Sequence, residues 1–109
     1  MTLKGQESNT INISAGGLLC SSDSSVPFKH REVVSGTIFV PNTTDEEINI
    51  IPFLCEIIRV DLVKELERNQ VALTFIKIHQ QDQQKILQYC FEKQRQMRLK
   101  ERKIKSLRR

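Results

Sequence analysis

The feature of the sequence that most constrains its fold is a single change of hydrophobic period near residue 80. Before it, apolar and polar residues alternate over short stretches, as in half-buried strands, and VALTFIKI at 71–78 is the clearest case. After it, one face of a helix is marked by Ile86, Leu87, Cys90, Phe91 and Met97. Strands followed by one helix are typical of a small antiparallel sheet or barrel that the helix closes at one end.

The same pattern divides the chain into expected elements. We predict strands over residues 10–13, 18–20, 29–40, 47–63 and 71–78. Val34, Gly36, Ile38 and Val40 fall on one face of the third of these strands. Pro52 indicates an edge position, a bulge or a break within the fourth.

Turns and chain ends follow from residue chemistry. Turns are expected at 14–17, at the serine-rich 21–25 and at 41–45, and Asp82 is the expected N-cap of a helix over about 82–105. Residues 1–7 are polar and expected to be loose, which leaves residues 8–109 as the domain. A length of 109 residues with 39% hydrophobic residues fits one folded domain rather than a disordered chain.

Charge is distributed unevenly along the chain. Residues 92–109 contain nine Lys or Arg and two Glu, a net charge of +7, whereas residues 1–91 carry −3. A basic tail of this kind can bind nucleic acid, a phosphate ligand, an anionic membrane or an acidic protein surface, or it can be the solvated end of a helix. No apolar stretch reaches the ~18 residues needed to span a bilayer. The first residues also lack the apolar core of a signal peptide, so we expect a cytoplasmic location.

Few residues are available for metal binding or catalysis. The cysteines at 20, 55 and 90 are odd in number and far apart, and they lie beside Leu, Phe or Tyr, which indicates small buried side chains rather than disulfides. His30 and His79 are isolated, so no zinc spacing is present. Without a nucleophile, base and orienting acid, we expect a binding protein and not an enzyme.

One polar segment offers groups for ligand binding. Asn12 and Ser14 are two residues apart and so share a face on a strand, and Gly16 and Gly17 permit positive φ and a close approach of the backbone. An amide, a hydroxyl and bare backbone at one turn suit a phosphate or a base. The same residues also suit a simple hairpin turn.

The segment NISAGGLL resembles the [Asp/Asn]-x-Ser-x-x-Gly signature of the PilZ domain, a bacterial receptor for cyclic di-GMP. The strand VALTFIKI and the Gln- and Arg-rich helix after it are similar to the last strand and C-terminal helix of that family, in the style of its flagellar-brake subgroup. The resemblance covers roughly residues 8–100. It implies a six-stranded antiparallel barrel with a C-terminal helix.

The resemblance also implies a site. Asn12 and Ser14 would hydrogen-bond guanine or phosphate oxygens, Gly17 would keep the backbone clear of the ligand, and Ala15 and Gly16 would line the turn. The ligand would be cyclic di-GMP, with no other cofactor and no metal. The partner would be an effector protein, such as a flagellar motor component.

The family's second signature, an Arg-x-x-x-Arg segment before the motif, has no counterpart among residues 1–11. Either that segment lies upstream of Met1, or the domain is degenerate and has weak or lost nucleotide binding. Arg98 and Arg102 have the spacing but lie on the helix, and Lys29 or Arg31 are candidate replacements. In both cases the first strand would be missing, and the open edge would favour a homo-oligomer or edge-strand pairing.

An alternative function is a protein- or nucleic-acid-interaction module that uses the basic helix and binds no nucleotide ligand. Nucleic acid is disfavoured because aromatic residues make up 6% of the chain, with no Trp, and do not alternate with the basic residues.

Overall fold

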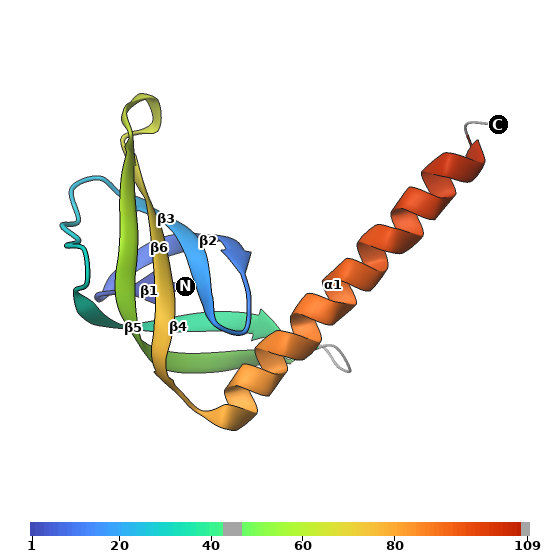
Figure 1. Cartoon of the computed structure of the whole chain (residues 1–109), viewed down its shortest axis with the longest axis horizontal. Helices are drawn as coiled ribbons and strands as arrows, with labels where there is room; N and C mark the ends of the chain where they lie inside the picture. The colour runs from blue at the N-terminus through green and yellow to red at the C-terminus, as the bar shows by residue number, and fades with distance from the viewer. Residues whose placement is uncertain (43–46, 108–109) are drawn as a thin grey trace.

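Figure 1 shows the computed structural model of the chain, which describes residues 1–42 and 47–107, with side chains as far as Leu99. The described residues form six strands, a short 3-10 helix and one long helix. In chain order the elements are β1 (Thr2–Leu3), β2 (Gln6–Ile13), β3 (Gly17–Asp23), β4 (Val33–Pro41), β5 (Ile48–Val63), η1 (Lys64–Leu66), β6 (Arg68–Ile78) and α1 (Gln80–Leu107). Of the turn predicted at 41–45, residues 43–45 lie outside the described residues.

The strands close into an antiparallel barrel in the order β1-β2-β3-β6-β5-β4 (Figure 1). The predicted mainly β fold with a C-terminal helix is therefore confirmed. Alternation places one face of each strand inside the barrel. On β4 the buried residues are Val34, Ile38 and Val40, with Gly36 between them, as predicted.

The core fills the barrel with aliphatic, aromatic and thiol side chains. Its buried members are Leu3, Leu18, Cys20, Val34, Ile38, Val40, Ile51, Phe53, Cys55, Ile57, Val71, Leu73 and Ile86. The ring of Phe53 packs edge-on against that of Phe75, with centroids 5.0 Å apart. The predicted burial of the cysteines is confirmed for Cys20 and Cys55, and Cys90 is partly buried.

Pro52 lies where β5 has a neighbour on one side. It pairs with Thr37 of β4, and the ladder between β5 and β6 starts only at Phe53. Register shifts follow between Leu54 and Cys55 and between Ile57 and Arg59. The long fifth strand thus tolerates proline at an edge and bends through bulges to serve both neighbours.

The N-terminal residues differ from the prediction. Residues 1–7 are not loose, because Thr2 and Leu3 form β1 between β2 and β4, and Leu3 is fully buried. The expectation that the first strand is missing is also wrong, because β1 closes the barrel. The argument for oligomerisation from an absent strand therefore fails, and the oligomeric state remains a prediction.

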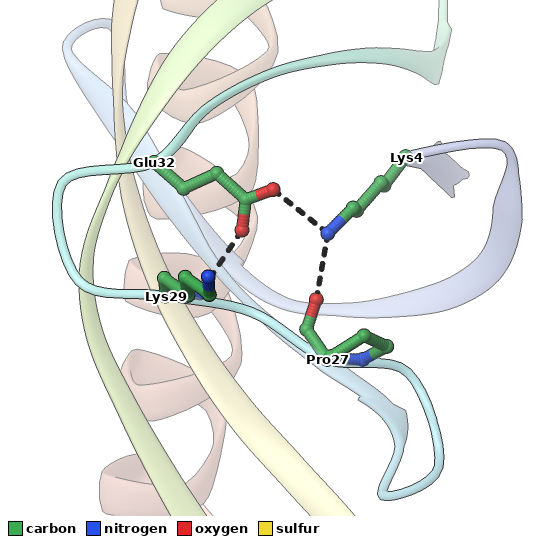
Figure 2. A network of polar contacts seen from close by, with 4 residues as sticks. All are labelled: Lys4, Pro27, Lys29 and Glu32. Carbon is green, nitrogen blue, oxygen red and sulfur yellow. Dashed lines mark hydrogen bonds and ion pairs between the residues drawn. The ribbon is translucent and has the colours of Figure 1, made fainter.

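A two-residue turn explains how so short a strand is held. Lys4 and Gly5 both have positive φ, 55° and 77°, the conformation of a type I′ hairpin turn. Lysine is unusual in this conformation, but its side chain is firmly bound (Figure 2). Its ammonium donates to the Pro27 carbonyl oxygen at 2.8 Å, and it pairs with the Glu32 carboxylate at 2.7 Å. This network joins the β1–β2 turn to the β3–β4 connection.

The helix begins two residues earlier than predicted. Its cap is His79 and not Asp82, since the His79 Nδ1 accepts from the Gln81 N–H at 3.3 Å and the His79 carbonyl from the Gln83 N–H at 3.0 Å. Ile86 is fully buried in the barrel, and the C-terminal part of α1 extends away from the barrel (Figure 1). Across residues 1–42 and 47–107, the structure contains no helix with the length and apolar character to span a membrane.

Candidate functional site

The polar motif forms the hairpin between β2 and β3. Ile13 pairs with Leu18 across the two strands, and Ser14 closes the turn by donating both its N–H and its hydroxyl to the Gly17 carbonyl, at 2.9 and 3.2 Å. Asn12 and Ser14 are both exposed. The structure therefore brings the predicted site residues, Asn12, Ser14, Ala15, Gly16 and Gly17, together in one turn.

The backbone of this turn is held by β6 and α1. The Gly16 carbonyl accepts from the Phe75 N–H at 2.9 Å and from the Thr74 hydroxyl at 3.1 Å. The Gln83 amide donates to the Ala15 carbonyl at 2.8 Å, and the Cys90 thiol donates to the Ile13 carbonyl at 3.3 Å. The carbonyl groups of Ile13, Ala15, Gly16 and Gly17 thus all accept hydrogen bonds around the turn.

The structure gives Gly17 a packing role that the sequence did not predict. A Cβ on Gly17 would lie 2.2 Å from the Leu73 carbonyl oxygen, so glycine is needed for β3 to approach β6. A Cβ on Gly16 would meet nothing within 4 Å. Among the described glycines only Gly5 has positive φ, so the motif glycines are not required for a left-handed backbone.

Two adjoining hollows flank the motif. The first, which we call the turn-side hollow, has a volume of about 420 Å³ and is lined by Asn12, Ile13, Ser14, Gly16, Gly17, Leu18, Leu19, Leu73 and Thr74. The second, the helix-side hollow, has a volume of about 370 Å³. Its lining residues are Thr10, Ile11, Asn12, Ile13, Ile38, Phe39, Val40, Tyr89, Cys90, Lys93, Gln94 and Met97. Asn12 and Ile13 line both, so the motif asparagine stands on the ridge between them.

The helix-side hollow exists because β1 is short. β1 pairs with Gln6 and Glu7 of β2 and with Gly36 and Thr37 of β4. Beyond those residues, β2 and β4 continue without a strand between them, and α1 lies beside this gap. The hollow therefore combines two strand edges, apolar side chains and one face of the helix.

Basic groups are unevenly placed around the motif. Lys93 is the charged residue among those that line the two hollows. Lys29 and Arg31 belong to the β3–β4 connection, at the other end of β3 from Gly17, and a seven-residue strand spans roughly 20 Å. Arg98 lies on α1 outside both hollows, and the side chain of Arg102 is outside the described residues.

The three cysteine thiols are poorly suited to act as nucleophiles. Burial raises the pKa of Cys20 to about 11 and that of Cys55 to about 12, and burial also raises the pKa of Cys90. Thiols with raised pKa values are weak nucleophiles at neutral pH. Among the described residues, no three His, Cys, Asp or Glu side chains gather as a metal site would require.

The described residues thus form a closed antiparallel barrel with a polar turn beside its C-terminal helix. A comparison with protein-family models matches residues 3–92 to the PilZ domain, and the chain therefore belongs to the PilZ family. No curated protein matches it. A solved structure of the Bacillus subtilis inhibitor of motility (MotI/DgrA) matches with a TM-score of 0.64 and 26% identity, covering 75% of this chain. The matched region is 38% of that protein's chain.

Several residues of the site were not predicted from the sequence. Thr74, Gln83 and Cys90 hold the turn, although they are 58 to 77 residues away from their partners in the chain. Lys93 appeared only as part of the basic tail. No local signal distinguishes these residues from others of their type, because their role depends on which elements the barrel places beside the motif.

Proposed function

We propose that the chain is a cyclic di-GMP receptor module of the PilZ type and not an enzyme, and that Asn12, Ser14, Ala15, Gly16 and Gly17 form part of its nucleotide site. The observation that carries this proposal is the exposed Asn12 amide on the ridge between the two hollows. Among the described residues, the side-chain amide of Asn12 has no hydrogen-bond partner. Membership of the family supports cyclic di-GMP as the ligand.

The turn suits a guanine nucleotide because it offers both donors and acceptors on a fixed support. The Asn12 amide can donate and accept, and the Ser14 oxygen can accept although its hydrogen is bound to Gly17. Because β6 and α1 already hold the turn, little ordering is needed on binding. Without the family's Arg-x-x-x-Arg segment among residues 1–11, we expect low affinity, since the phosphates lose charge-assisted contacts.

Calorimetry with cyclic di-GMP tests this proposal. Asn12→Ala is expected to weaken binding roughly three- to tenfold, the effect of one or two hydrogen bonds. Asn9→Ala, an exposed asparagine on the same strand outside both hollows, is the matched control and should leave affinity unchanged. Absence of heat with the unsubstituted chain at millimolar ligand would contradict the receptor proposal and favour the degenerate alternative.

We also propose that the module contacts an effector protein, such as a flagellar motor component, through the outer face of β4 and β5. Phe39 lies opposite Ile50 there, and Pro41 lies opposite Ile48. Phe39, Ile48 and Ile50 are all more than half exposed, which is unusual for a surface without a partner. Because Phe39 also lines the helix-side hollow, a bound nucleotide would touch the same side chain as the effector. Binding of a motor component that is insensitive to cyclic di-GMP would contradict this coupling.

A second candidate function is an interaction module built on α1 with no nucleotide ligand. The exposed Phe91 and Leu99 lie together with Arg95 and Arg98 around one shallow hollow on the helix. Apolar and cationic groups on one helix face suit an acidic protein surface or nucleic acid. Binding of a random-sequence oligonucleotide that weakens with salt, without any binding of cyclic di-GMP, would favour this candidate.

A further inference from the structure

The helix supplies a charged group to the hollow beside the motif. Lys93 lines the helix-side hollow together with Asn12, and every other residue around that hollow is uncharged. Its ammonium lies 5.3 Å from the centroid of the Tyr89 ring, a cation–π contact. Among the described residues Lys93 has no carboxylate partner. In contrast, Lys4 pairs with Glu32, and Arg59 pairs with Asp61.

The helix segment that carries Lys93 is anchored beside the motif. The Cys90 thiol binds the Ile13 carbonyl, and the Gln83 amide binds the Ala15 carbonyl, two helical turns earlier. Ile86, between them, is fully buried in the barrel core. Lys93 follows Cys90 by less than one turn and so projects from a helix segment that is anchored directly to the turn carrying Asn12 and Ser14.

We propose that Lys93 binds a phosphate of the dinucleotide from the helix-side hollow, while Asn12 contacts the same ligand from the ridge. This inference rests on the proposed function. A dinucleotide at the motif brings two negative charges, and a phosphate removed from water needs a cation or several donors. Lys93 supplies that cation where the turn itself supplies only neutral groups. The Tyr89 ring limits the positions of the ammonium and reduces the entropy lost when it binds.

This arrangement predicts a charge-dependent contribution to affinity. Lys93→Gln removes the charge while keeping a polar side chain of similar length, and it is expected to weaken binding of cyclic di-GMP roughly 10- to 100-fold. Lys93→Arg keeps the charge and should restore most of the affinity. The affinity of the unsubstituted chain should fall more steeply with salt than that of Lys93→Gln, which a purely structural role would not produce.

The experiment is calorimetry of the full chain with cyclic di-GMP at two salt concentrations. Arg95→Gln is the matched control, because Arg95 lies two residues away on α1 but outside both motif hollows. Equal unfolding midpoints for the variants show that the fold is unchanged.

The outcomes separate this inference from the function on which it rests. Loss of affinity in Lys93→Gln and Asn12→Ala, but not in Arg95→Gln, supports both. Loss in Asn12→Ala alone overturns the role of Lys93 and leaves the receptor proposal standing. Equal losses in Lys93→Gln and Arg95→Gln also overturn it, because they indicate a general charge effect of the helix. If the unsubstituted chain does not bind, the receptor proposal fails and the role of Lys93 fails with it.

Discussion

The two ends of the barrel differ in which polar side chains are paired and which are left available. At the end formed by the Lys4–Gly5 turn and the β3–β4 connection, which we call the loop end, polar side chains bind one another or the backbone: Lys4 with Glu32, Asp23 with Ser25, and Arg68 with Ser21. At the motif end, formed by the β2–β3 turn and the start of α1, side chains of β6 and α1 bind the turn backbone. In the described part of the chain, Asn12 and Lys93 at this end have no hydrogen bond or ion pair with another side chain. Polar contacts at the loop end are thus expected to contribute to stability, whereas Asn12 and Lys93 are available to the ligand that we propose.

The largest expected effect is the loss of stability that follows when the packing of α1 at the motif end is disrupted. Ile86 is fully buried in the core, so Ile86→Ala leaves a cavity where α1 enters the barrel and should lower the free energy of unfolding by about 2–5 kcal/mol. The measurement is urea denaturation followed by circular dichroism. Leu87→Ala is the control: Leu87 is on the same helix but 43% exposed, so its truncation should lower the free energy of unfolding much less. Equal losses would mean that α1 does not depend on Ile86 for docking.

The next effect distinguishes the two motif glycines. Gly17→Ala places a methyl group against the Leu73 carbonyl and should lower stability by about 1–3 kcal/mol, because β3 must move from β6. Gly16→Ala meets no atom within 4 Å and should change stability by less than about 0.5 kcal/mol. Thermal denaturation of both variants measures the difference. If Gly16→Ala is as damaging as Gly17→Ala, steric contact with β6 is not the reason for the glycine.

The smallest effect concerns the loop end and depends on pH. The hydrogen bond from Lys4 is the main cause that lowers the pKa of Glu32, and the bond from the Lys29 N–H adds to it. A carboxyl with a lowered folded-state pKa stabilises the protein above its unfolded pKa of about 4.3, and this contribution is lost as the pH falls through the folded value. Glu32→Gln should therefore be less stable than the unsubstituted chain at pH 7 and nearly equal to it at pH 3.

Urea denaturation at the two pH values checks this prediction, with Glu65→Gln as a control on the exposed η1 helix. The Glu32 effect is expected to be small because its carboxylate is partly solvated and the ion pair lies at the surface. A deficit of Glu32→Gln that persists unchanged at pH 3 would show that side-chain shape, and not charge, matters at this position.

The sequence predicts the parts of the fold that depend on local periodicity. The alternation on β4 correctly identifies Val34, Ile38 and Val40 as core, and the change of period correctly places a helix after β6. β1 was missed because two residues cannot show a period and because Lys4 adopts a positive φ more typical of Asn or Gly. The His79 cap was missed because histidine is rarely used in that position.

The candidate site was predictable only in part for a related reason. Asn12, Ser14 and the two glycines form a contiguous motif, and a contiguous motif is visible in the sequence. Their supports come from β6 and α1, so Gln83 and Cys90 become recognisable only once the barrel has closed. The same holds for Lys93, which the sequence shows as one of nine basic residues near the C-terminus.

Because α1 is long, a small tilt where it packs on the barrel would move its far end by several ångströms. From Ile86 to Leu107 the helix runs roughly 30 Å at 1.5 Å per residue, and most of that length extends beyond the barrel (Figure 1). A tilt of about ten degrees at Ile86 would displace the far end by roughly 5 Å. A small change in the orientation of α1 where it packs beside the motif would therefore cause a larger displacement at its far, positively charged end.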